Sequence, residues 1–257
     1  MLPQAAIADA ILASSRRGRP ALVAFMTAGF PARDRFVADL QRISAAADVI
    51  EIGVPFSDPM ADGMTIQRSS RAALADGVTL AWIIGELAAL ATRPRTPLLL
   101  MSYLNPLLAY GIARLPAEAR TAGIAGLIVP DLPFEECAEL RAALAAEGIA
   151  LVQMVTPVTP PQRLAMLARE SEGFVYAVTM TGTTGRDVAV PDTVLEYLDR
   201  VRAAAAVPVC AGFGIRHAAQ VARLAGHADG VIVGSALVEV LERGEDPAGF
   251  LRSLRPG

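Results

Sequence analysis

The stretch VIEIGVPFSDPMADG, residues 49–63, begins as a continuous apolar run and then opens into a polar loop. An unbroken apolar run is typical of a parallel strand that helices cover on both faces. The run nevertheless carries one carboxylate, Glu51, and the loop carries two more, Asp58 and Asp62. The stretch therefore predicts a buried strand followed by a polar loop, and the recurrence of this unit along the chain indicates the fold.

Short apolar runs of this kind alternate with longer helical patterns along the whole chain. The candidate strands are ALVAFMT (21–27), DVIEIG (48–53), PLLLMSY (97–103), GLIVP (126–130), ALVQMV (150–155), FVYAVTM (174–180), VPVCAG (207–212) and GVIVGS (230–235). Amphipathic stretches rich in Ala and Leu lie between them, for example at 33–47, 135–148 and 160–173. Eight such units predict a closed (β/α)8 TIM barrel.

Two further helices are expected, one at 3–17 before the first strand and one near 79–91 between strands two and three. The alternative fold is an open doubly wound sheet, but no G-x-G-x-x-G follows an early strand. No linker or shift in composition divides the chain, so we expect residues 1–257 to form a single barrel domain.

Composition narrows the classes of partner and compartment. The net charge is −3 and the arginines form no cluster, which argues against nucleic acid as a partner. No run approaches the roughly 18 apolar residues of a membrane span, and the N-terminus lacks the order of a secretory signal. The two cysteines, Cys137 and Cys210, lie far apart in the sequence and suggest a reducing, cytoplasmic setting.

All 23 basic residues are arginine, and there is no lysine. A lysine Schiff base, with a substrate carbonyl or with pyridoxal phosphate, is therefore impossible in this chain. The two histidines, His217 and His227, lie near no cysteine or carboxylate cluster with ligand spacing, so we expect no metal site. Any carbon chemistry is expected to use carboxylates, hydroxyls and backbone dipoles, without a cofactor.

Three glycine-bearing loops near the end of the chain predict a phosphate site. In such barrels the loops after strands seven and eight commonly bind phosphate with a helix N-terminus. The glycines are Gly185 in MTGTTGRD (180–187), Gly214 in AGFGIR (211–216) and Gly234 in VGSALVEVLERG (233–244). Ser235 is expected to act as a helix N-cap and hydroxyl donor. The alternative for each glycine is a simple chain turn, but three at neighbouring strand ends favour a phosphorylated small molecule.

Three polar side chains predict acid–base chemistry at the barrel mouth. Because strand residues alternate in direction, Glu51 is expected to point into the pore, where burial should raise its pKa. The alternative is a structural glutamate held by a pore arginine. Asp62 is expected to fold over the mouth or simply to shape a turn. Tyr176 is the only polar ring in its strand and either faces the same pore or packs in the core.

The stretch IEIGVPFSDPMADG resembles the signature of the tryptophan synthase alpha subunit family. Further similar segments occur in order: FMTAGFP (25–31), MSYLNPLLAYG (101–111), GLIVPDLPFEE (126–136), GFVYAVTMTGTTG (173–185), CAGFGI (210–215) and DGVIVGSALV (229–238). The resemblance implies a (β/α)8 barrel that cleaves indole-3-glycerol phosphate to indole and glyceraldehyde 3-phosphate. It also implies a pyridoxal-phosphate beta subunit as partner, which this chain, lacking lysine, cannot itself be.

The resemblance also implies roles for individual residues. Glu51 and Asp62 match the catalytic carboxylates of the family, and Tyr176 matches its active-site tyrosine. The phosphate-binding positions are Gly185, Gly214, Gly234 and Ser235. The positions that match the indole pocket are Phe25, Ile66, Leu100, Tyr103, Thr184 and Phe213.

Five positions depart from the family pattern, and all lie in expected mouth-side loops. Met180 and Thr181 stand where Ser or Arg types are frequent. Met64 replaces the proline of A-D-G-P, Phe30 replaces the aspartate of T-A-G-D-P, and Thr183 stands where an apolar residue is common. These departures motivate a second hypothesis, a stand-alone lyase that does not depend on a beta subunit. Two further alternatives are a phosphosugar isomerase on the same barrel and an inactive alpha-like interaction protein.

Overall fold

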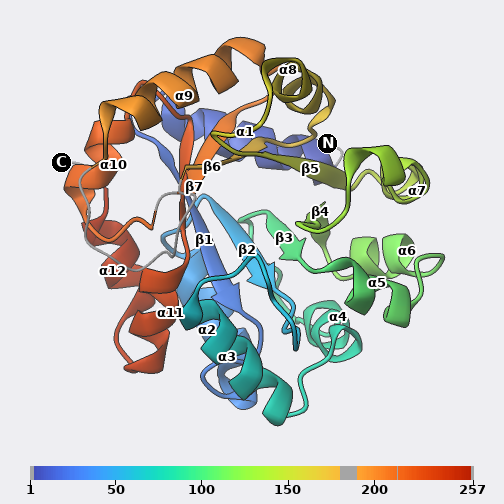
Figure 1. Cartoon of the computed structure of the whole chain (residues 1–257). Helices are drawn as coiled ribbons and strands as arrows, with labels where there is room; N and C mark the ends of the chain where they lie inside the picture. Colours follow the sequence, from blue (N-terminus) through green and yellow to red (C-terminus); the bar gives the residue numbers. More distant parts are fainter. Residues whose placement is uncertain (1–2, 180–189, 213, 256–257) are drawn as a thin grey trace.

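Eight parallel strands close into a barrel in the order in which they occur along the chain (Figure 1). The computed structural model describes residues 3–179, 190–212 and 214–255. The strands are β1 (Ala21–Thr27), β2 (Val49–Gly53), β3 (Leu98–Met101), β4 (Ile124–Ile128), β5 (Ala150–Val155), β6 (Val175–Val178), β7 (Val209–Gly212) and β8 (Gly230–Val233). The barrel closes through pairing of β1 with β8, which confirms the predicted fold class and excludes the open sheet.

Helices surround the barrel (Figure 1). They are α1 (Pro3–Ser15), α2 (Phe36–Ser44), α3 (Met64–Ala75), α4 (Leu80–Ala88), α5 (Leu104–Tyr110), α6 (Leu115–Thr121), α7 (Ala138–Ala146), α8 (Pro161–Glu170), α9 (Asp192–Ala204), α10 (Ala218–Leu224), α11 (Ser235–Glu242) and α12 (Pro247–Ser253), with 3-10 turns η1 (Arg33–Arg35) and η2 (Phe134–Glu136). The expected extra helices are present as α1 and α4. Two pairs were not expected as separate helices, α5 with α6 after β3 and α11 with α12 after β8.

The prediction for the fourth strand was displaced along the chain. GLIVP (126–130) was expected, whereas β4 covers Ile124–Ile128. Proline has no N–H to donate to a ladder, so Pro130 belongs to the loop rather than to the strand. Where β4 ends, its pairing with β5 also ends, at Ile128 opposite Val152.

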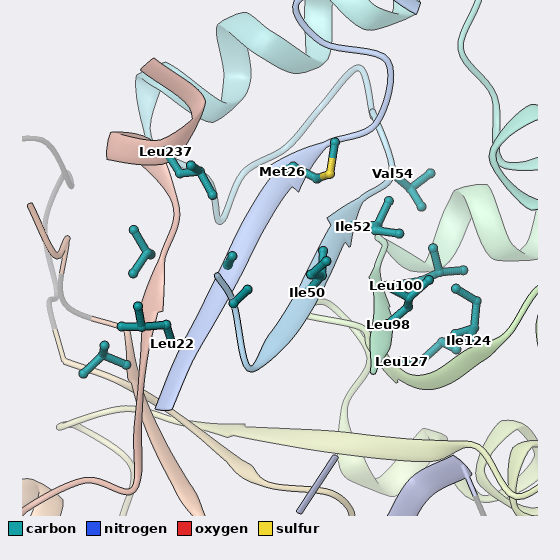
Figure 2. Close-up of a cluster of buried hydrophobic side chains, with 14 of the residues drawn as sticks. Leu22, Met26, Ile50, Ile52, Val54, Leu98, Leu100, Ile124, Leu127 and Leu237 are labelled. Carbon is teal, nitrogen blue, oxygen red and sulfur yellow. The ribbon is translucent and has the colours of Figure 1, made fainter. Parts of the chain in front are cut away.

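Alternation along the strands separates two buried layers. Leu22, Ala24 and Met26 of β1 belong to the large core between barrel and helices, and Figure 2 shows part of this core. Val23 of β1 belongs to a second cluster that fills the pore, together with Val49 of β2. Ile7 and Ile11 of α1 join the pore cluster, and Ile7 contacts Gly173 just before β6. Helix α1 therefore closes the N-terminal end of the barrel, and the opposite end remains for a site.

No helix in the described part of the chain is long and apolar enough to cross a membrane.

Candidate active site

Glu51 lies in the pore on β2, in register with Phe25 of β1 and Leu99 of β3. Its side chain is fully buried, and neither carboxylate oxygen has a hydrogen-bond partner among the described residues. No arginine in the described ranges pairs with it, so the structure lends no support to the alternative of a structural ion pair. Burial, and then the nearby charge of Asp62, raises the pKa of Glu51 from 4.5 to about 8. A carboxyl that is protonated at neutral pH can donate a proton.

Asp62 follows β2 in the loop that covers the mouth of the pore. Burial raises its pKa from 3.8 to about 6, against the opposing effect of a hydrogen bond from Tyr103. The Tyr103 hydroxyl also accepts the Ala61 N–H at 2.9 Å, and the Gln67 amide donates to the Asp62 carbonyl at 2.9 Å. Phe56 also stacks on the Tyr103 ring, with centroids 5.1 Å apart. Tyr103 therefore contacts the loop through both its hydroxyl and its ring.

A narrow cavity lies between the loop and the pore. It is lined by Phe25, Thr27, Gly53, Val54, Asp62, Ile66, Ser70, Met101 and Tyr103. Phe25 and Ile66 therefore line the same space as Asp62, as the family resemblance implied. Gly53 leaves room there for the Phe25 ring, because a Cβ on it would lie 2.5 Å from a ring carbon. Thr27, Ser70 and Met101 were not foreseen.

Leu100, expected in the indole pocket, lies on the other side of the sheet. It packs in the core between barrel and helices, near Ile52 and Leu127 (Figure 2). Its neighbours Leu99 and Met101 face the pore. The expectation for Leu100 was wrong by one residue, which reverses the side-chain direction in a strand. Alternation from Leu99 could have identified Met101 as the lining residue.

Tyr176 lies in the pore on β6, between Met154 of β5 and Cys210 of β7. Its ring packs over Gly212, where a Cβ would lie 2.9 Å from a ring carbon. Burial, and then the charges of Glu51 and Asp62, raises the pKa of its hydroxyl well above the ordinary value. Tyr176 therefore stays protonated and faces the space beside Glu51.

The candidate phosphate positions that the structure describes lie at the ends of two neighbouring strands. Gly214 follows β7 with φ of +74°, a conformation that favours glycine, and no atom of the described residues other than its chain neighbours lies within 4 Å of the place where its Cβ would be. Gly234 and Ser235 follow β8. Ser235 was expected as the N-cap of α11, but Gly234 holds that position and Ser235 is the first helical residue. The Ser235 hydroxyl has no hydrogen-bond partner among the described residues.

Three predicted site residues, Gly185, Thr184 and Phe213, lie outside the described residues, as do the departures at Met180, Thr181 and Thr183. The other two departures are described. Phe30 is 6% exposed and packs with Phe25 and Val238. Met64 begins α3 and is 67% exposed, and Met60 in the preceding loop is 92% exposed. The loop that carries Asp62 and the start of α3 therefore each present a methionine side chain to solvent.

Within the described ranges, no group of three or more His, Cys, Asp or Glu side chains is placed to hold a metal ion. The described site residues are instead two carboxylates in unlike surroundings, a protonated tyrosine, and a strand-end region where the Ser235 hydroxyl has no partner among the described residues. A proton donor with a pKa of about 8 beside a carboxylate with a pKa of about 6 can carry out acid–base chemistry near neutral pH.

The chain is similar in sequence to proteins of one family. The sequence model described as "Tryptophan synthase alpha chain" matches residues 12–253. The alpha chain of Nitratidesulfovibrio vulgaris (strain DP4) is 48% identical over 237 residues, which cover 92% of each chain. That of Geobacter sp. (strain M21) is 44% identical over 260 residues, covering 98% of this chain and 97% of the relative.

Solved structures show the same likeness. A Mycobacterium tuberculosis tryptophan synthase chain superposes with a TM-score of 0.87 at 34% identity and 98% coverage of both chains. A chain of the Pyrococcus furiosus tryptophan synthase α2β2 complex superposes with a TM-score of 0.84 at 35% identity, covering 91% of this chain and 97% of that one.

Proposed function

Since the chain belongs to the tryptophan synthase alpha chain family, we propose that it is a lyase that cleaves indole-3-glycerol phosphate to indole and glyceraldehyde 3-phosphate in tryptophan biosynthesis. One observation carries this proposal: Glu51 is buried in the pore without a partner among the described residues, and its pKa is raised to about 8. An unpaired buried carboxyl costs stability, so its position favours a role in chemistry over one in packing.

The reaction is a retro-aldol cleavage, and the substrate ring supplies the electron sink. Glu51 in its protonated form donates a proton to C3 of the indole ring, which becomes a cationic indolenine. The Glu51 carboxylate then accepts the proton of the side-chain hydroxyl as that oxygen forms a carbonyl. The bond between C3 and the side chain breaks, and its electron pair returns to the ring to give indole. None of these reaction steps needs a lysine, and the chain contains none.

Asp62 is proposed to accept a hydrogen bond from the ring N–H and to stabilise the positive charge on the cationic ring. With its pKa of about 6, Asp62 is ionised at neutral pH while Glu51 remains protonated. Tyr176 is proposed to contact the substrate beside Glu51. Phe25, Ile66, Met101 and Tyr103 are proposed to enclose the ring, because they line the cavity that also contains Asp62.

Ser235→Ala is expected to raise KM about tenfold and to change kcat less than about twofold, because one hydrogen bond to the charged phosphate is lost. Steady-state indole release measures both constants. Ser44→Ala, which removes an exposed hydroxyl on α2, is the matched control. An unchanged KM in Ser235→Ala would contradict the proposed phosphate contact.

Tyr103→Phe is expected to lower kcat roughly tenfold, because the Ala61 N–H loses its acceptor and Asp62 loses a donor. The ring and its packing on Phe56 remain, so substrate binding should change little. Tyr110→Phe is the control, since the Tyr110 hydroxyl contacts Glu118, away from the site. Equal rates in the two variants would show that the Tyr103 hydroxyl does not position the loop.

We propose a tryptophan synthase beta subunit as the partner of this chain, in the cytoplasm, and a single barrel domain over residues 1–257. The likeness to a chain of the Pyrococcus furiosus α2β2 complex supports the partnership. The exposed Met60 and Met64 beside Asp62 offer an apolar surface at the mouth for it.

Indole release by the purified chain, measured with and without an added beta subunit, tests both the reaction and the partnership. Release of indole in either condition supports the lyase, and absence of indole in both contradicts it. Strong stimulation by the beta subunit supports the partnership. An unchanged rate favours the stand-alone lyase.

A further inference from the structure

A second cavity, of about 340 Å³, opens where β4 and β5 separate. The loop Val129–Phe134 forms one wall, and Cys137 and Leu167 on the helix side form another. None of its lining residues also lines the narrow cavity around Asp62. Figure 1 shows α7 and α8 near β5 on the outside of the barrel. The second cavity therefore lies apart from the narrow cavity around Asp62, and it approaches the pore only at Val152 and Met154, the latter beside Tyr176.

Gln153 of β5 places a carboxamide in this cavity. Its neighbours Leu151 and Val155 belong to the core between barrel and helices, so alternation directs the Gln153 side chain to the same side, where Cys137 and Leu167 line the cavity. Gln153 is only 8% exposed. Its backbone N–H donates to the Ser171 hydroxyl, but the side-chain amide has no partner among the described residues. A carboxamide has two donors and an acceptor, and neither amide atom of Gln153 is among the fully buried polar atoms without a partner, so both can contact a molecule in the cavity.

The charged side chains and the Thr159 hydroxyl of the cavity already form hydrogen bonds or ion pairs. Arg163 forms a two-point ion pair with Glu135, at 2.5 and 3.0 Å. Asp131 accepts the Leu104 N–H at the start of α5, at 2.8 Å. The Thr159 hydroxyl pairs with the Thr156 N–H at 2.9 Å. Burial raises the pKa of the Cys137 thiol, which keeps it neutral. Among the lining residues, the Gln153 amide is a polar group without a partner in the described ranges, and the side chains of Leu132, Phe134 and Leu167 add apolar surface.

We propose that this cavity binds a small neutral molecule that presents a hydrogen-bond donor beside an acceptor, as a cyclic amide does. The donor would meet the Gln153 carbonyl and the acceptor its NH2 group, while an apolar ring would fill the space toward Leu167. The volume lies within the range of known small-molecule sites.

Calorimetric titration with 2-quinolone, a bicyclic cyclic amide, tests the proposal. The purified chain is expected to bind it, and Gln153→Leu, which keeps the bulk but removes the amide, is expected to weaken binding about tenfold or more. Gln41→Leu, the same change at an exposed position on α2, is expected to leave the affinity unchanged. Quinoline, which lacks the amide, is expected to bind weakly and equally to all three proteins.

Three results would overturn the proposal. One is no binding of 2-quinolone at millimolar concentration. Another is equal affinity in wild type and a folded Gln153→Leu. The third is binding that indole displaces and that Gln153→Leu leaves unchanged, since this would place the probe in the pore.

A second measurement needs only the wild-type chain, so it remains decisive if Gln153→Leu does not fold. Because the loop Val129–Phe134 forms a wall of the cavity, bound 2-quinolone is expected to slow hydrogen–deuterium exchange of its backbone amides, as peptide mass spectrometry would show. Quinoline at the same concentration is the control, and the exposed residues 244–246 provide an internal reference. Equal exchange rates of the loop with and without 2-quinolone would overturn the proposal.

Discussion

Glu51→Gln is expected to abolish indole release, lowering kcat by about a thousandfold or more, while the substrate still binds. The glutamine amide has nearly the shape of the protonated carboxyl but neither donates a proton to C3 nor accepts one from the hydroxyl. Stopped-flow or steady-state indole assays give kcat, and equilibrium titration with indole-3-glycerol phosphate gives the affinity. Glu139→Gln on the exposed face of α7 is the matched control. Near-normal turnover in Glu51→Gln would rule out the proposed proton transfer.

The same variant makes a separate prediction for stability, which also tests that it folds. The pKa of Glu51 is about 8 in the folded chain. In the unfolded chain we expect the ordinary value for a glutamate, 4.5. Between these values the folded state keeps a proton that the unfolded state releases, so stability declines as pH rises, by up to about 1.4 kcal/mol per pH unit. Glu51→Gln has no carboxyl that titrates at this position, so its stability does not decline with pH for this reason. Its melting temperature at pH 8 should exceed that of wild type, and the difference should vanish near pH 4.

Asp62→Asn is expected to lower kcat/KM by about a hundredfold, because the amide carries no charge to stabilise the cationic ring. The wild type should show a bell-shaped dependence of kcat/KM on pH. Activity should rise through an apparent pKa of about 6, as Asp62 ionises, and fall through about 8, as Glu51 loses its proton.

In Asp62→Asn the acidic limb should disappear. The basic limb should move to lower pH, since the charge of Asp62 contributes to the raised pKa of Glu51. Asp58→Asn is the control, because Asp58 is exposed in the same loop and accepts a hydrogen bond from Ser57. A profile that keeps its acidic limb in Asp62→Asn would exclude Asp62 as the group that must be ionised.

The strand and helix pattern was readable from the sequence, because each buried strand is a short apolar run. β1 and β5 have the predicted bounds, and α1 and α4 appear where extra helices were expected. Where a predicted strand boundary differs from the observed one, the cause is local. The fourth strand was placed too late because apolar content alone does not distinguish a ladder residue from Val129 and Pro130, which follow the strand.

The site was only partly readable for a different reason. A carboxylate in an apolar strand points to a polar interior, so Glu51 could be selected from one segment. Leu100 and Met101 are both apolar neighbours, and only the direction of β3 in the closed barrel shows which of them reaches the cavity. The contacts of Tyr103 with Ala61 and Asp62 join residues about 40 positions apart, and no local pattern predicts such a pairing.

By itself, the sequence determined the (β/α)8 class, the family, and the identity of the two carboxylates, because periodicity, composition and motif are properties of neighbouring residues. Tertiary structure decided which face each strand residue presents, which loop residue holds Asp62, and where a cavity with an unpaired Gln153 opens. It also decided the protonation states, since the raised pKa values of Glu51 and Asp62 arise chiefly from burial by residues brought together from distant parts of the chain. These features depend on distances in space, which only closure of the barrel sets.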